Sequence, residues 1–266
     1  MQLNLDSDAE CEHPPEPRRR ALLQAGLCAA FGGVAVRRAG QETLVFTFSD
    51  DFAGAAGSTP DPTKWTHEPG SPDDQLEQYV NDRQHSFLDG NGHLILRATR
   101  ETVRGNTIYK SARITTMETF SQSQGHFEAS LKVNSQKGLW PAWWMLGTLE
   151  DWPQGGEIDF LEDFGDNHQE TSVHDPTSAT SKYAELSGDA AWHIYRMDWT
   201  TTSMTFSRDG KQYLTVKKSE VPHWPYGAGR PMYMILNLAV GGLVGTPPAS
   251  VTFPVDITVG YVHVWK

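Results

Sequence analysis

The chain has 266 residues and a formal net charge of −11, since 33 aspartates and glutamates outweigh 22 lysines and arginines. This acidic balance disfavours nucleic acid and anionic membranes as partners, because both attract lysine and arginine. The 24 glycines and 16 prolines indicate many turns, as an all-β fold requires.

Residues 1–40 differ from the rest of the chain in composition. A polar stretch leads to residues 18–20, all arginine, and then to an apolar run over residues 21–36. A basic cluster before a short apolar stretch is typical of an export signal, and the arginines followed by Ala-Leu-Leu resemble a twin-arginine signal. The run is too short to predict a membrane span. We therefore expect an export signal and a secreted protein, with a disordered leader as the alternative.

Residues 41–266 form one predicted domain. Both cysteines, Cys11 and Cys28, precede it, so neither a disulfide nor thiol chemistry is expected within it. Short alternating segments separated by turn residues continue to the end, and residues 126–133 show the period of two that marks a half-buried strand. The other such segments are residues 93–98, 195–199, 204–207, 213–216 and 262–265, with Asp209-Gly210 as a hairpin turn. We expect a single all-β domain, a sandwich of two antiparallel sheets.

An acidic motif occupies residues 155–163, which read Gly-Gly-Glu-Ile-Asp-Phe-Leu-Glu-Asp. On a strand, Glu157 and Asp159 share a face because they are two residues apart. Glu162 is an odd number of residues from Glu157, so a regular strand would point it into the core, where an unpaired carboxylate is costly. A β-bulge near residues 160–161 would return Glu162 to the face of the other two acids. The sequence therefore predicts three acids on one face of a bulged strand.

Three crowded carboxyl groups suit proton chemistry. Retaining hydrolysis of a glycosidic bond needs two carboxyl groups about 5–5.5 Å apart, one to attack the anomeric carbon and one to protonate the leaving oxygen and later deprotonate water. Asp159, between the outer two acids, can share a proton or a hydrogen bond with Glu157. A solvated acidic strand face and a calcium site are the alternatives for the motif taken alone.

With these residues the sequence resembles glycoside hydrolase family 16, the laminarinase and lichenase family, whose signature Glu-x-Asp-x-x-Glu it matches. Further segments resemble the family in order along residues 44–266. These segments are residues 50–52, 64–65, 78–82, 89–94, 111–114, 125–132, 138–147 and 236–242. The resemblance implies a concanavalin A-like β-jelly-roll sandwich with a concave sheet as its cleft. It also implies Glu157 as nucleophile, Asp159 as its partner and Glu162 as general acid/base.

Aromatic and polar residues around the motif are expected to bind the substrate. Trp140 and Trp144 share a strand face, whereas Trp143 takes the other; aromatic rings stack on the apolar faces of sugars. The resemblance implies that Trp140 and Trp144 face the cleft and that Trp143 joins the core; burial of all three in the core is the alternative. The resemblance further implies cleft positions for His174, Asn81, Arg113 and Asn237, each of which could instead have a structural role. Met117 and Glu118 are also expected to reach the cleft.

No metal or cofactor is expected. Many relatives carry a calcium ion held by an aspartate shortly before the terminal strand, and that position is Gly260 here, with Asp256 only a remote substitute. The resemblance, and the extra residue in the acidic motif, favour a monomeric endo-acting enzyme on laminarin-type β-1,3-glucan or mixed-linkage β-1,3-1,4-glucan. The alternatives are a galactan (agar-type) hydrolase, a transglycosylase, and a lectin that binds carbohydrate without cleaving it.

Overall fold

The computed structural model describes residues 45–177 and 180–266. The expected export signal and the expected domain boundary after residue 40 lie outside these residues. The described part is built almost wholly from β-strands in two sheets, with two short 3₁₀ turns, Lys218–Glu220 and Gly242–Val244. None of its helices is long and apolar enough to span a membrane. The expected all-β sandwich is confirmed.

One sheet has ten strands. In spatial order the main path is β15 (Lys211–Lys217), β14 (Ser203–Arg208), β13 (Trp192–Trp199), β8 (Gly125–Val133), β17 (Val255–Trp265), β5 (Leu94–Val103), β6 (Asn106–Ser111) and β3 (Glu77–Tyr79). Two short strands extend it, β1 (Phe46–Asp50) beside β17 and β4 (Ser86–Leu88) beside β5. The pairing of β3 with β6 at the sheet edge is parallel, whereas the other strand pairs of the described residues are antiparallel, as predicted.

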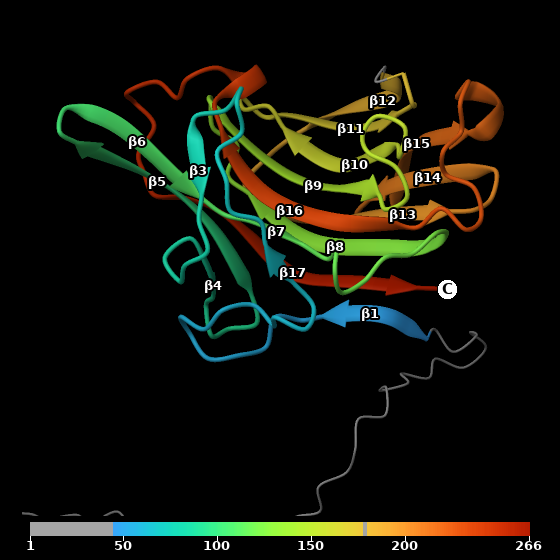
Figure 1. The fold of residues 1–266 in the computed structure, drawn as a ribbon, viewed down its shortest axis with the longest axis horizontal. Coiled ribbons are helices and arrows are strands. Elements are labelled where there is room, and N and C mark those ends of the chain that lie inside the picture. The colour runs from blue at the N-terminus through green and yellow to red at the C-terminus, as the bar shows by residue number, and fades with distance from the viewer. Residues whose placement is uncertain (1–44, 178–179) are drawn as a thin grey trace, which may run out of the picture. The chain divides into compact units, whose positions relative to one another are not determined.

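The other sheet has seven strands and carries the acidic motif. Its order is β12 (Thr180–Ser187), β11 (His168–His174), β10 (Glu157–Asp163), β9 (Leu139–Gly147), β16 (Met232–Val240), β7 (Arg113–Thr115) and β2 (Thr66–His67). Figure 1 shows β9 and β16 as long, bowed ribbons that run side by side above β8 of the ten-stranded sheet. The motif strand therefore lies inside the sheet, with a neighbour on each side.

The strands form where the sequence alternates. In β8 the side chains of Phe127, Ala129, Leu131 and Val133 are at most 3% exposed, because alternate residues of a strand point to one face and here that face meets the core. The predicted hairpin between β14 and β15 is also confirmed, with positive φ at both Asp209 and Gly210, as a tight two-residue turn requires.

The core between the sheets is rich in aromatic rings. Phe160 of β10 stacks on Trp143 with ring centroids 3.9 Å apart, and it meets Phe127 and Phe206 of the ten-stranded sheet at 6.2 and 6.3 Å. All four side chains are at most 1% exposed, and removing a buried ring of this kind costs about 3–5 kcal/mol. The expected core position of Trp143 is confirmed, and Phe160 fixes the motif strand β10 to the core between the two sheets.

Candidate active site

The strand register places the predicted acids and their neighbours on one face of the seven-stranded sheet. Directly opposed residues of an antiparallel pair share a face; Glu157 lies opposite His174, and Asp159 lies opposite both Trp144 and Ser172. This face of the sheet is called the acidic face below. By these pairings it carries Arg113 and Thr115 of β7, Tyr233, Ile235 and Asn237 of β16, Trp140, Ala142, Trp144 and Leu146 of β9, Glu157, Asp159 and Glu162 of β10, His168, Glu170, Ser172 and His174 of β11, and Tyr183 and Glu185 of β12. The buried Ile158 between the acids points the other way, so the acidic face is turned away from the core.

A β-bulge brings the third acid to this face. Between Asp159 and Glu162, β10 advances three residues while the partner strand advances two, from Ser172 to Glu170. On the other side, β10 takes two steps from Asp159 while β9 takes one. The extra residue is thus Phe160, as predicted, and Phe160 and Leu161 are both buried in the core. This arrangement re-aims Glu162 without placing a carboxylate among apolar side chains.

Each outer acid accepts a hydrogen bond from a tryptophan. The indole nitrogen of Trp152 lies 2.6 Å from Oε2 of Glu157, and the indole nitrogen of Trp140 lies 3.0 Å from Oε1 of Glu162. Hydrogen bonds to ionised groups are stronger than neutral ones and fix direction. Trp140 therefore lies on the acidic face as predicted, and its ring edge orients an acid in addition to any contact with a sugar.

The middle acid is held by two polar neighbours. The Ser172 hydroxyl donates to Oδ2 of Asp159 at 2.5 Å, and Nε2 of His174 lies 3.0 Å from the same oxygen. Asp159 is 1% exposed, so these contacts replace the water that a buried carboxylate would otherwise need. The resemblance implied a position for His174 near the acid/base group; in the structure it lies opposite Glu157 and its partner is Asp159.

The acids change one another's protonation. Burial, and then the charge of Asp159, raise the pKa of Glu157 from 4.5 to about 7. Burial, followed by the charges of Asp159 and Glu157, raises the pKa of Glu162 well above its usual value. Burial opposes the charged form of His174, but the hydrogen bond and the charge of Asp159 outweigh it and raise the pKa of this imidazole. General acid–base catalysis needs an acid that is protonated near neutral pH, and the raised pKa of Glu162 provides one beside Glu157.

A polar chain holds the second tryptophan. The Trp144 indole donates to Oδ1 of Asn237 at 2.7 Å, and the Asn237 amide donates to the Tyr79 hydroxyl at 3.1 Å. The Arg113 guanidinium lies 4.9 Å from the Trp144 ring centre and pairs with Glu68 at 2.8 Å. Asn237 is 5% exposed and its amide is already engaged, so it holds Trp144 in place, whereas Trp144 and Arg113 remain partly exposed on the acidic face.

One predicted binding residue lies apart from this group. Asn81 is exposed in the segment after β3, and no hydrogen bond of the described residues joins it to the acidic face. The segment that holds Asn81 follows β3, which lies at the edge of the ten-stranded sheet. The strand register thus places eight of the nine predicted site residues on the acidic face, whereas Asn81 lies outside the seven-stranded sheet that carries this face.

A cavity of about 400 Å³ adjoins Glu157. It is lined by Met117, Leu146, Trp152 and Tyr233, among others, and Leu146 lies directly opposite Glu157 in the sheet. Met117 and Trp152 are 59% and 51% exposed, so apolar surface is presented at its rim. Met117 reaches the site as expected, whereas Glu118 is not part of the lining. A larger cavity, of about 690 Å³, lies away from the acids beside β4 and β5.

Three supporting residues escaped prediction from the sequence. Trp152 lies five residues before Glu157, outside the acidic motif, and Ser172 precedes His174 by two residues, a spacing that places it on the same face. The buried Tyr226 comes from a distant loop; its hydroxyl accepts from the backbone N–H of Glu157 at 3.2 Å and also contacts the carbonyl oxygen of His174. Only the spacing of Ser172 carried a usable signal, because loop contacts depend on the folded chain.

Comparison with known proteins places the chain among carbohydrate-cleaving enzymes. Residues 74–256 match the model of the family "Glycosyl hydrolases family 16". A β-glucanase of Rhodothermus marinus is 30% identical over 94% of this chain and 94% of its own length. The endo-1,3-1,4-β-glycanase EglC of Rhizobium meliloti is 28% identical over 85% of this chain, which spans about half (52%) of that relative.

Solved structures agree with the sequence comparison. The endo-β-1,3-glucanase of Pyrococcus furiosus superposes with a TM-score of 0.75 and 29% identity, over 87% of this chain and 97% of that one. Residues 74–256, which the family model matches, contain the bulged strand and the whole acidic face. The chain therefore belongs to glycosyl hydrolase family 16.

Proposed function

We propose that this protein is a retaining endo-β-glucanase that hydrolyses laminarin-type β-1,3-glucan or mixed-linkage β-1,3-1,4-glucan. The observation that carries the proposal is the bulged strand β10, which presents Glu157, Asp159 and Glu162 on one face with the pKa of both outer acids raised. Three close carboxyl groups repel one another and raise each other's pKa, and such perturbed groups are typical of sites that carry out proton chemistry. The relatives named above, a β-glucanase and a 1,3-1,4-β-glycanase among them, support glucan as the substrate class.

In this proposal Glu157 is the nucleophile. Its carboxylate attacks the anomeric carbon and forms a glycosyl-enzyme, while Glu162 donates its proton to the departing oxygen. Glu162 then takes a proton from water, which releases the sugar with its original anomeric configuration. The Trp152 N–H aims Oε2 of Glu157, and the Trp140 N–H aims Oε1 of Glu162. No further group needs to move, because both acids are already oriented.

Asp159 and His174 regulate the charge of the nucleophile. Burial makes the largest contribution to the raised pKa of Glu157; the charge of Asp159 raises this pKa further, and that of His174 lowers it. When Glu157 loses its negative charge in the glycosyl-enzyme, the repulsion from Asp159 disappears. We therefore assign Asp159 and His174 as positioning residues that favour formation of the covalent intermediate.

The substrate chain would lie along the acidic face. Trp144, Trp140 and Arg113 are partly exposed there, and tryptophan rings suit the C–H faces of glucose units. The cavity beside Glu157, with Trp152 and Met117 at its rim, can receive a further sugar unit. A face open along several strands suits cleavage within a polymer.

The test is release of reducing ends from laminarin, curdlan, barley mixed-linkage glucan, agarose and xyloglucan. We expect activity on the first three, and Glu157→Gln should lower it by at least about 10⁴-fold while binding of laminari-oligosaccharides persists. Glu101→Gln, on the exposed part of β5 in the other sheet, is the matched control. Activity on agarose alone would refute the substrate class, and binding without turnover by the wild type would favour a lectin.

The place of action is a separate proposal. The basic cluster and apolar run of residues 18–36 support export, and a polymer too large to enter a cell requires a secreted enzyme. Expression with and without residues 1–40, followed by assay of the culture medium, tests this. Equal amounts of enzyme in the medium would refute the export signal. Size-exclusion chromatography of the same material tests the expected monomer.

A further inference from the structure

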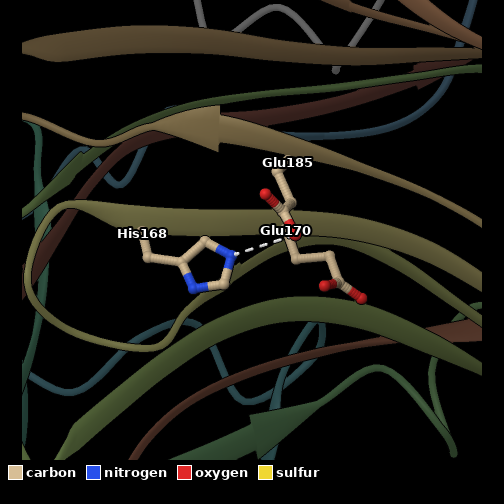
Figure 2. Close-up of side chains that lie close together, drawn as sticks. All are labelled: His168, Glu170 and Glu185. Carbon is tan, nitrogen blue, oxygen red and sulfur yellow. Dashed lines mark ion pairs between the residues drawn. The ribbon is translucent and has the colours of Figure 1, made fainter.

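A group of metal-ligating side chains lies on the acidic face, apart from the three acids. His168 and Glu170 are two residues apart on β11 and therefore share a face, and Glu185 of β12 is directly opposite Glu170. One ligand atom from each lies within 4.8 Å of the others. Figure 2 shows the imidazole turned toward Glu185, with the two nearest atoms 3.9 Å apart.

We infer that His168, Glu170 and Glu185 bind a divalent cation of the zinc class. One nitrogen and two carboxylates are a donor set that Zn²⁺ accepts, whereas Mg²⁺ and Ca²⁺ prefer oxygen ligands throughout. In tetrahedral coordination, with bonds of about 2.0–2.2 Å, the ligand atoms around one Zn²⁺ stand about 3.3–3.6 Å apart. The three ligand atoms here lie within 4.8 Å of one another, so the side chains must close by about 1 Å, and those of His168 and Glu185 are exposed and can turn to do so.

The two carboxylates give a physical reason for a cation. Glu170 and Glu185 are opposed across the strands, and like charges in that relation destabilise a sheet. Among residues 45–177 and 180–266, the ion pairs give neither carboxylate a lysine or arginine; His168 is the sole partner of Glu185, at 3.9 Å. A bound divalent cation would remove the repulsion and occupy all three side chains.

The position of the ion would matter for catalysis. Glu170 is directly opposite Glu162 in the sheet, so the ion would lie one strand away from the proposed acid/base. It would occupy the part of the acidic face along which a sugar chain would run. We therefore expect Zn²⁺ to inhibit hydrolysis. This expected inhibition rests on the proposed function, whereas Zn²⁺ binding itself does not.

The test measures Zn²⁺ binding to the full chain by isothermal titration calorimetry. His168→Ala and Glu185→Gln should each weaken one site by at least about tenfold, the scale on which even outer ligand partners act. The matched control is His193→Ala, since both ring nitrogens of this half-buried histidine of β13 already contact aspartates, Asp209 at 2.6 Å and Asp189 at 3.0 Å. The control should bind Zn²⁺ as the wild type does, and Mg²⁺ should not compete.

Two outcomes would overturn the inference. The first is that His168→Ala binds Zn²⁺ as the wild type does, or that neither binds it. The second is that Glu185→Gln keeps the affinity of the wild type for Zn²⁺. Because Cys11 and Cys28 can also bind Zn²⁺, the site is assigned from the difference between variants. Equal melting temperatures without metal exclude misfolding as the cause. If these variants lose Zn²⁺ binding but are still inhibited by Zn²⁺, the inhibitory ion binds elsewhere. The binding result does not depend on which substrate the enzyme cleaves.

Discussion

The indole nitrogen of Trp152 lies 2.6 Å from Oε2 of Glu157. Trp152 belongs to the segment between β9 and β10, five residues before the glutamate, and it lines the cavity beside that acid. One side chain thus both orients the proposed nucleophile and forms the wall of an adjoining binding space. Alignment of the carboxylate and occupation of the cavity are therefore physically linked.

Replacing Trp152 by phenylalanine should separate these two roles. The ring remains at the cavity, but the hydrogen bond to Glu157 is lost, and a bond to a charged group contributes about 1.5–3 kcal/mol. We expect kcat to fall by about tenfold to a hundredfold with little change in KM. Trp192→Phe, on the exposed surface of β13, is the control. An unchanged kcat would show that the bond does not orient the nucleophile.

The pH profile of kcat/KM should be bell-shaped and displaced upward. Glu157 must be ionised and Glu162 protonated, so activity rises as pH passes the pKa of Glu157, about 7, and falls as it passes the raised pKa of Glu162. Asp159→Asn removes a negative charge that raises both pKa values, so both limbs should move to lower pH. Kinetics across pH 4–10 checks this, and limbs that stay in place would contradict the coupling.

The stability of the fold should depend on the protonation of Glu157. Its pKa is raised from 4.5 to about 7, so the folded protein holds this proton more tightly and loses stability as pH rises through that interval. At about 1.4 kcal/mol per pH unit, the loss is at most about 3.5 kcal/mol. Glu157→Gln should therefore be more stable than the wild type at pH 8 but similar at pH 4. Urea denaturation at both values measures it; equal stability at pH 8 would refute the shift.

Asn237 should act on binding through Trp144. Asn237→Leu keeps the volume but leaves the Trp144 indole and the Tyr79 hydroxyl without their present partner, at a cost of about 1–3 kcal/mol. We expect a lower melting temperature and a higher KM, with kcat less affected. The exposed Asn106→Leu of β6 serves as control. A variant with normal KM would mean that Trp144 does not contact the substrate.

The anomeric form of the first product tests the double displacement directly. Retention requires β-configured reducing ends to form first and to convert to the α-form only by mutarotation. Proton NMR during the first minutes of hydrolysis distinguishes the two forms. Early α-product would show that water attacks directly, and Glu157 would then be a general base.

The sequence by itself determined several of the strands, the shared face of the three acids on β10 and its bulge. Local alternation decides which residues of a strand can be buried, and the odd spacing of Glu157 and Glu162 left a bulge as the only way to keep both carboxylates out of the core. These conclusions need no knowledge of which strand pairs with which. The same alternation put Trp143 on the opposite strand face from Trp140 and Trp144, and the family resemblance implied which of the two faces meets the core.

Tertiary structure alone decided the partners of these residues. Trp152 and Tyr226 meet Glu157 through loops, Asn237 is engaged by side chains from other strands, and Glu185 joins His168 and Glu170 only because β12 pairs with β11 in one register. Register and loop path are set by packing between residues distant in the chain, which local periodicity does not encode. For the same reason the sequence did not predict the parallel pairing of the edge strand β3 with β6.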